Sequence, residues 1–377
     1  MTDTLAGTGR REESLEVIRQ GFAMDPKNED LLNMQSYVLA RWSDFNAALT
    51  ANDRYAAVRP SDANPHDSRG DILYQAGRGD EAIAAYRKVI EIKPDFSDYG
   101  DYLKLAIVYA DQKKRDMSEA AFQQFAQHSD ALERLYLPGF EAQLQQMRGD
   151  FEGALGSYRR AVLQLGRAGQ NEVAATFLQE FASLSVMVGQ SSAALSFVQQ
   201  QKLEGEELQP VAFLQIMAGN TSAAEQSLQH FASSHPWVTP HTLELQKAQY
   251  EMAAAVERND GQSAVNRAGS LPDFQLPELL FLKARAHLLT NDYASADAEF
   301  RRALLLERDL SNFIVLRLRF PAFQILSGFY LGQLYDRTGR RDQALSEYQE
   351  FLSHFDNSHT RLAQLGEARA ALKRLMQ

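Results

Sequence analysis

Residues 70–94 read GDILYQAGRGDEAIAAYRKVIEIKP, and the order of small, aromatic and helix-ending residues in this stretch decides the fold. Gly70 and Ala82 are small enough to let two antiparallel helices approach closely, and Tyr86 is large enough to fill the gap beside them. Two further glycines mark the turn between the helices. Pro94 ends the second helix, because proline has no N–H to donate inside a helix. The stretch therefore predicts a helical hairpin.

A similar residue pattern recurs at a fixed interval along the sequence. Pro26, Pro60 and Pro94 are 34 residues apart and close the phrases GFAMDP, YAAVRP and VIEIKP. Self-similarity at a period of this length is typical of repeat architectures. A proline after the second helix of each unit cannot continue that helix but readily begins the next one. The chain is therefore expected to be an array of stacked hairpins.

The last unit has the fullest version of the pattern, with small, aromatic and apolar residues at Leu331, Gly332, Tyr335, Gly339, Ala344, Tyr348 and Phe351. On these residues and the 34-residue period, the chain resembles the tetratricopeptide-repeat (TPR) family. Small/aromatic pairs four residues apart indicate further units at Ser118/Phe122, Ala154/Tyr158, Ala193/Phe197 and Ala296/Phe300, with weaker units near Ala48, Ala223 and Ala264. The resemblance implies an all-α fold, a TPR-type α-solenoid in which stacked antiparallel helix pairs form a right-handed superhelix.

The resemblance spans nearly the whole chain, so residues 1–377 are expected to form a single TPR-like array of about nine helix pairs. We expect a leading half repeat at 11–26, regular repeats at 27–165, degenerate repeats at 166–270, regular repeats at 271–355 with an insertion near 305–321, and a capping helix at 356–377. The insertion holds the apolar run Phe313–Phe320, for which burial in the core is favoured over a dimer or partner patch. The array begins with the second half of a repeat unit. Two explanations stay open: a segment of a longer protein precedes this half repeat, or the half repeat is a simple N-terminal cap.

Composition excludes several classes of function. The chain has no cysteine, which rules out disulfides, thiolate metal sites and cysteine nucleophiles and fits a reducing compartment, so the cytoplasm is expected. The formal net charge of -10 would repel nucleic-acid phosphates and anionic lipids, and no basic patch is segregated in the sequence. We therefore expect neither a nucleic-acid nor a membrane partner.

No motif for catalysis or cofactor binding is found. The phrase Gly7-Thr-Gly-Arg10 lacks the lysine and the spacing of a phosphate-binding loop, and there is no kinase signature. His230, His235 and His241 lie in a proline-punctuated stretch without a helix to fix their geometry, which favours a polar loop over a metal site. The sequence predicts a protein that is not an enzyme and that needs no cofactor and no metal.

The remaining candidates are binding surfaces. Curvature of a solenoid turns the first helix of every pair toward the concave side, where the expected groove positions are Asp71, Tyr74, Gln75, Asp111, Gln143, Gln146, Arg285, Gln333 and Arg337. Amides and arginine there could hold a peptide backbone or carboxylate, and the alternative for each residue is a solvated position on an amphipathic helix.

Members of this family that bind a terminal carboxylate use a lysine, asparagine and arginine clamp. The corresponding positions here carry Asp67, Asp71, Phe329 and Gln333, so the clamp is missing. An acidic groove would instead prefer basic or apolar segments.

Trp237 lies outside the groove, between Pro236 and Pro240. An exposed tryptophan there would be an anchor for a partner. The favoured alternative is a tryptophan that plugs the gap between degenerate repeats, because its side chain carries a large apolar area.

These features predict a protein-protein interaction scaffold that binds protein or peptide segments. The phrase at 64–71 and the run from Phe329 through Leu352 resemble repeat arrays attached to bacterial serine/threonine kinases and winged-helix regulators. The chain is therefore expected to be a module of a larger bacterial protein. The alternative is a sensory domain that binds a small ligand and reports to an attached kinase or transcription regulator.

Overall fold

The computed structural model describes residues 10–201, 205, 208–273, 276–310, 321–356 and 358–377. Helices make up all regular structure in these ranges, which contain no strand, so the predicted all-α fold is confirmed. None of the helices found there is both long enough and apolar enough to cross a membrane.

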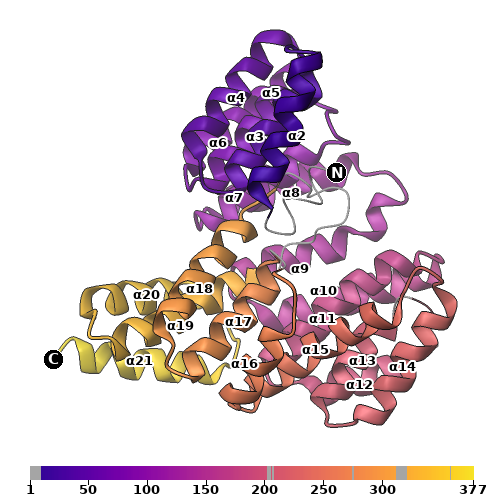
Figure 1. The fold of residues 1–377 in the computed structure, drawn as a ribbon, viewed down its shortest axis with the longest axis vertical. Coiled ribbons are helices and arrows are strands. Elements are labelled where there is room, and N and C mark those ends of the chain that lie inside the picture. The colour runs from indigo at the N-terminus through magenta and orange to yellow at the C-terminus, as the bar shows by residue number, and fades with distance from the viewer. Residues whose placement is uncertain (1–9, 202–204, 206–207, 274–275, 311–320, 357) are drawn as a thin grey trace. The chain divides into compact units, whose positions relative to one another are not determined.

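Nine helix pairs are present in the described ranges, as the repeat spacing predicts (Figure 1). Their first helices are α3 (Glu29–Arg41), α5 (Asn64–Gln75), α7 (Gly100–Asp111), α9 (Leu137–Met147), α11 (Asn171–Met187), α13 (Leu208–Met217), α15 (Pro240–Glu257), α17 (Pro277–Leu289) and α19 (Pro321–Arg337). The second helices are α4 (Phe45–Val58), α6 (Gly79–Ile92), α8 (Arg115–His128), α10 (Phe151–Arg167), α12 (Ser191–Gln199), α14 (Thr221–Ser234), α16 (Gly261–Gly269), α18 (Tyr293–Glu307) and α20 (Arg341–Ser353). The unpaired helices α2 (Arg11–Met24) and α21 (Ala363–Leu375) lie where leading and trailing helices are expected, and a short 3-10 helix covers Glu133–Leu135.

The contacts within the described residues divide the chain into two compact units. Unit 1 holds residues 1–134, 273–277 and 302–319, and unit 2 holds 135–272, 278–301 and 320–377. The sequence predicts one continuous array, and its continuity from one unit to the other stays a prediction. The apolar run Phe313–Phe320, within the expected insertion, lies outside the described residues.

The close approach of paired helices rests on glycine packed against tyrosine. A Cβ added at Gly70 in α5 would lie 2.4 Å from Cε1 of Tyr86 in α6, and one at Gly332 in α19 would lie 2.8 Å from Cδ1 of Tyr348 in α20. Both tyrosines are buried. Tyr86 thus packs directly onto the glycine of its own pair, which explains why the repeat needs a small residue there.

Replacement of Gly70 by alanine is expected to lower the free energy of unfolding by about 1–3 kcal/mol, because the added methyl overlaps a fully buried ring. Gly166→Ala in α10 is the matched control, since nothing lies within 4 Å of the added Cβ and alanine favours a helix. Urea denaturation of both variants measures the difference. Equal stability of the two variants would contradict the packing account.

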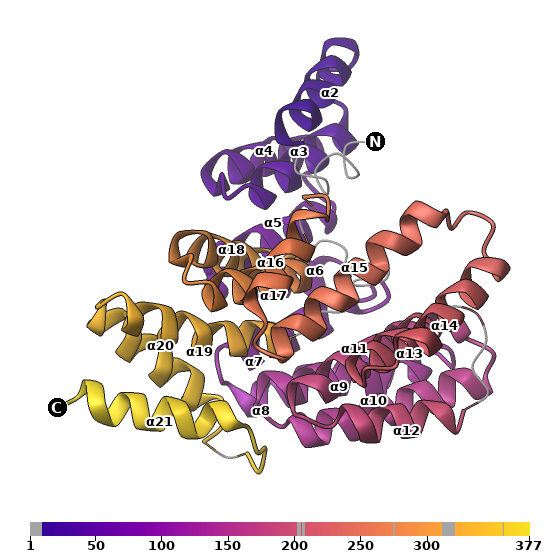
Figure 2. The ribbon, with the colours of Figure 1, turned by 60° about the horizontal axis from the view of Figure 1, so that its bottom comes forward.

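The degenerate repeats form three complete pairs, α11–α12, α13–α14 and α15–α16 (Figure 2). In two of them the buried alanine lies one residue after the alanine named from the sequence. Ala193 is exposed and Ala223 is half-buried, whereas Ala194 and Ala224 are buried at 1% and 0% exposure. In each case two adjacent alanines are available, and the helix places the second one against its neighbours.

Candidate functional site

Two consecutive first helices of unit 1, α5 and α7, meet at a buried cluster of charges. Lys104 in α7 donates from Nζ to Asp67 in α5 and to both carboxylate oxygens of Asp71, at 2.8 and 3.1 Å. Asp101, one turn before Lys104 in the same helix, adds a third carboxyl group. Asp71, Asp101 and Lys104 are 2–4% exposed. We call these four residues the Lys104 cluster.

Two tyrosines complete the surroundings of Asp71. Tyr37 in α3 donates its hydroxyl to Oδ2 of Asp71 at 2.9 Å, and Tyr86 in α6 donates to Oδ1 at 2.8 Å. Asp71 therefore accepts bonds from α3, α6 and α7 at once. Such a fully bonded carboxylate ties three pairs of helices to one point.

Burial and mutual repulsion strongly shift the protonation of the carboxyl groups. Burial, partly opposed by Lys104, raises the pKa of Asp71 to about 7. Burial and the neighbouring carboxylate of Asp67 raise the pKa of Asp101 to about 9. Burial alone would lower the pKa of Lys104, but the attraction of Asp67 and Asp71 raises it overall, so the ammonium stays charged.

These shifts predict that unit 1 loses stability as the pH rises. The pKa values of Asp71 and Asp101 are higher in the folded chain than the usual ~3.9 of an unfolded aspartate, so the folded state binds more protons between these values. The stabilisation is complete below about pH 4 and is lost as the pH passes through about 7 and then 9. Thermal unfolding between pH 5 and 9 should show a falling midpoint. The decline should be shallower in Asp101→Asn than in Asp116→Asn, which removes an exposed carboxylate, and equal slopes would refute this assignment.

Sequence reasoning found Asp71 but missed Asp101, Lys104 and Tyr37. The signal available was spacing, because Tyr37 and Asp71 are 34 residues apart, as are Asp67 and Asp101. Lys104 stands 34 residues after Gly70, where the repeat pattern expects a small residue. A charged residue at the position where the repeat pattern has a small one is therefore the sequence feature by which this cluster can be recognised.

Most of the predicted groove residues are buried within the array. Exposure is 5% or less for Asp71, Tyr74, Gln75, Gln143 and Gln146. Asp111, Arg285 and Gln333 are partly exposed, and Arg337 is exposed. In this conformation the buried side chains hold the fold together, and a direct role of the nine residues in partner binding stays a prediction.

Residues 302–310, which we call the docked segment, contact the ends of first helices within unit 1. The guanidinium of Arg302 lies 4.5 Å over the ring of Trp42, the residue that follows α3. Arg41, at the end of α3, forms an ion pair with Asp309 at 3.4 Å. The carbonyl oxygen of Arg41 accepts a further bond from Arg302. The docked segment thus covers one end of α3.

The docked segment also reaches α5. Gln75, a predicted groove residue, donates from Nε2 to the carbonyl oxygen of Leu305 at 3.4 Å. Leu306 and Leu310 are buried at 5% and 0% exposure. The amide of Gln75 therefore binds a peptide backbone, and that backbone belongs to this same chain.

In unit 2, the predicted groove glutamine Gln146 is used in the same way. Its Oε1 accepts from the backbone N–H of Ala322 in α19 at 3.2 Å, and its Nε2 lies 2.6 Å from the hydroxyl of Tyr158 in α10. A repeat near the beginning of unit 2 is thus bonded directly to the last complete pair.

A second set of contacts, the closure contacts, joins the α9–α10 turn to the residues after α20. The carbonyl oxygen of Gly149 accepts from the hydroxyls of Ser358 at 2.6 Å and Thr360 at 2.7 Å. Oγ1 of Thr360 accepts from the N–H of Phe151 at 3.0 Å, and the ring of Phe151 meets that of Phe355 edge-on at 5.4 Å between centroids. The first helix pair of unit 2 is therefore bonded to the residues that follow its last pair. We call this arrangement the closed circuit of unit 2.

Two other predicted groove residues of unit 2, Arg285 and Gln333, also have partners in the chain. Arg285 is ion-paired with Glu257, and its guanidinium lies 4.7 Å over the ring of Tyr330. Gln333 donates to Glu367 in α21 at 3.2 Å. Arg285 is therefore part of the packing between α15, α17 and α19, while Gln333 lies at the surface with α21.

Trp237 is 65% exposed, so the buried plug favoured from the sequence is wrong. Its ring meets those of Phe231 and His235 edge-on, at 6.2 and 5.7 Å between centroids. These contacts hold one side of the indole and leave the rest in solvent. A role of Trp237 as a partner anchor stays a prediction.

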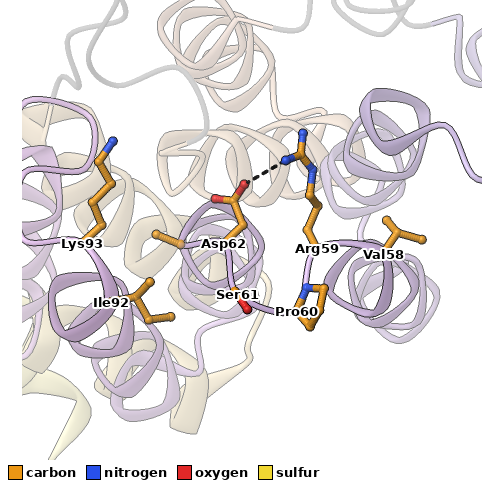
Figure 3. Close-up of a pocket in the computed structure, with 8 residues that line it drawn as sticks. Val58, Arg59, Pro60, Ser61, Asp62, Ile92 and Lys93 are labelled. Carbon is orange, nitrogen blue, oxygen red and sulfur yellow. Dashed lines mark ion pairs between the residues drawn. The ribbon is translucent and has the colours of Figure 1, made fainter.

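A surface hollow of about 480 Å³ lies where the second helices of two pairs end (Figure 3). Its lining includes Pro60, the ion pair of Arg59 and Asp62 at 3.6 Å, and the exposed Lys93. In the part of the chain that the structure describes, no three His, Asp or Glu side chains are arranged to hold a metal. The hollow is lined by both polar and apolar side chains.

Comparison with known proteins identifies repeats in three stretches. Family models described as TPR repeat or tetratricopeptide repeat match residues 70–113, 277–310 and 327–358. A comparison with curated proteins gives no match.

Several solved structures align along most of the chain. Cut9, in the APC/C hetero-tetramer with Hcn1, is 11% identical over 99% of this chain and 76% of its own, with a TM-score of 0.43. A tetratricopeptide repeat protein from Parabacteroides merdae is 13% identical over 84% and 99%, with a TM-score of 0.34. Yeast Tom70 is 12% identical over 100% and 95%, with a TM-score of 0.31.

Proposed function

Because the chain is a tetratricopeptide-repeat protein, we propose that it is a non-catalytic scaffold that holds protein or peptide segments against its first helices. The observation that carries this proposal is the bond from Gln75 to the carbonyl oxygen of Leu305. It is an example, inside the chain, of a first-helix amide holding a peptide backbone. The Lys104 cluster supports the same role, because its charges come from the first helices α5 and α7, and Tyr37 of the first helix α3 bonds to it.

Photo-cross-linking tests the proposal at the predicted groove residues that reach the surface. The photoreactive amino acid p-benzoylphenylalanine is placed at Asp111, Gln333 or Arg337, one position at a time, and the chain is irradiated in cell extract. The matched controls are Gln123 and Gln349, which are exposed on the second helices α8 and α20. We expect discrete cross-linked proteins from first-helix positions only. The same products from both sets of positions, or none from either, would contradict the scaffold proposal.

We further propose that the chain works in the cytoplasm of a bacterium as the interaction part of a larger protein. The resemblance of residues 64–71 and 329–352 to arrays attached to bacterial kinases and winged-helix regulators supports this, and the net charge of -10 supports the absence of nucleic-acid and lipid partners. The gene sequence before Met1 tests whether the chain is part of a larger protein. A kinase or DNA-binding domain encoded there supports it, and an in-frame stop codon there refutes it.

A further inference from the structure

Helix α21 occupies the position of a first helix. Gly366 follows Gly332 of α19 by 34 residues, which is the repeat period. Glu367 accepts a bond from Gln333, again 34 residues earlier, so α21 lies beside α19 in the same register. α21 also packs against α20, as α7 packs against α6. Among the described residues, α21 is paired with no second helix, and it lies at the edge of unit 2 (Figure 2).

The glycine of α21 faces open space, unlike the glycines of complete pairs. A Cβ added at Gly332 would lie 2.8 Å from the ring of Tyr348, whereas nothing lies within 4 Å of a Cβ added at Gly366. Gly366 is exposed, and Ala368, on the opposite side of α21, is buried. The face that the first helix α19 turns toward its second helix is therefore uncovered in α21.

The uncovered face of α21 is basic. Its residues recur every three or four positions and so share one side of the helix, which we call the α21 face: Gly366, Arg369, Ala370 and Lys373. All four are exposed. Neither Arg369 nor Lys373 forms an ion pair with any residue that the structure describes, whereas the neighbouring Arg374 is paired with Asp336. Two unpaired cations one turn apart favour carboxylates of another molecule.

We propose that the α21 face binds a helix of a partner protein, one that is acidic in its first turn and carries an aromatic residue about two turns later. This inference rests on the proposed scaffold function and names the partner chemistry for one surface. The partner's ring takes the place at Gly366 that Tyr348 takes at Gly332. Acidic residues favour the first turn of a helix, and the second helices α6, α8 and α20 all have one there.

The spacing in the α19–α20 pair sets the position of the acidic turn. There Tyr348 lies on Gly332, and Asp342 precedes this tyrosine by six residues, about 9 Å along an α-helix. On α21, Lys373 follows Gly366 by seven residues, about 10.5 Å. In an antiparallel partner helix with the spacing of α20, the acidic first turn therefore lies beside Lys373.

Fluorescence anisotropy with the full chain is the test. The probe is a labelled peptide with the sequence of α20, Arg341–Ser353, carrying Arg341→Glu and a hydrocarbon staple between positions 346 and 350 that keeps it helical. We expect saturable binding to wild type, although the net charge of -10 repels an acidic peptide in general. Gly366→Leu should weaken binding about tenfold or more, because the leucine side chain occupies the place of the peptide's tyrosine. Arg369→Gln/Lys373→Gln should weaken it about fivefold.

The controls make the same changes elsewhere in unit 2. Gly166→Leu in α10 also fills open space, since nothing lies within 4 Å of a Cβ added there. Arg167→Gln/Arg258→Gln removes two cations that are exposed. Both controls should bind the probe as wild type does. Equal weakening in a variant and its control, or no binding to wild type, would overturn the inference.

Two further measurements separate this inference from its alternatives. The probe with Tyr348→Ala should bind about tenfold more weakly, and unchanged binding would refute the aromatic contact. Sedimentation of wild type tests a second copy as the occupant: a dimer that Gly366→Leu dissociates would assign the α21 face to self-association and overturn the inference. Photo-cross-linking from Asp111 does not involve α21. Cross-links from Asp111 without probe binding would therefore leave the scaffold proposal standing while the α21 face is wrong.

Discussion

A chain in which Lys104 is replaced by methionine is expected to lose about 3–5 kcal/mol of unfolding free energy in unit 1. Methionine keeps the length and the apolar stem of lysine but removes the ammonium that is bonded to Asp67 and Asp71. Breaking a buried ion pair from one side leaves the carboxylates buried without a counter-charge. Guanidinium denaturation followed by circular dichroism measures the loss.

Lys88→Met provides the control for this prediction. Lys88 is also ion-paired, with Glu91 at 2.9 Å, but both side chains are exposed, so its replacement should cost no more than about 1 kcal/mol. The loss in Lys104→Met should also shrink at acid pH, where the carboxyl groups of Asp71 and Asp101, whose pKa values are raised, are protonated. Similar losses in the two variants would mean that burial of the Lys104 cluster contributes little.

Gly149→Ala is expected to break the closure contacts of unit 2 and to lower its stability by about 2–5 kcal/mol. Gly149 has a φ of +71°, which costs an alanine about 1–2 kcal/mol. The added Cβ would also lie 2.4 Å from the backbone oxygen of His354, a rigid group that cannot turn away, and such overpacking adds about 1–3 kcal/mol. Chemical denaturation gives the total loss.

Gly189→Ala separates the two causes. Gly189 has nearly the same φ, +73°, and nothing lies within 4 Å of a Cβ added there. It should show the backbone cost alone. Amide exchange at Phe151, whose N–H donates to Thr360, should accelerate in Gly149→Ala and not in Gly189→Ala. Identical behaviour of the two variants would refute the closed circuit.

The sequence predicts the pairs well wherever the small and aromatic residues are distinct. Gly70 and Tyr86 meet as the repeat pattern requires, and the nine pairs follow from the same spacing. Where two alanines are adjacent, as at Ala193 and Ala194, the pattern cannot choose between them. Burial against neighbouring helices decides that choice, and it depends on residues far away in the sequence.

The candidate site could be predicted only in part, because first-helix positions follow from the period but their burial does not. Gln146 is buried and hydrogen-bonded to Ala322, and Gln75 is buried and hydrogen-bonded to Leu305. In each case the two partners belong to distant repeats. Lys104 was not predicted for a different reason. It replaces a small residue of the repeat pattern, and only the folded structure shows that its ammonium is bonded to Asp67 and Asp71.

The docked segment has a consequence for the order in which the chain can fold during synthesis. Residues 10–134 of unit 1 leave the ribosome long before residues 302–310, whose Leu306 and Leu310 are buried in that unit. At ~5–20 residues per second, synthesis of residues 135–301 takes roughly 8–35 s. During this interval the ends of α3 and α5 lack the contacts of Arg302, Leu305 and Asp309. The nascent chain is therefore open at these helix ends to chaperones or to a partner before its own segment arrives.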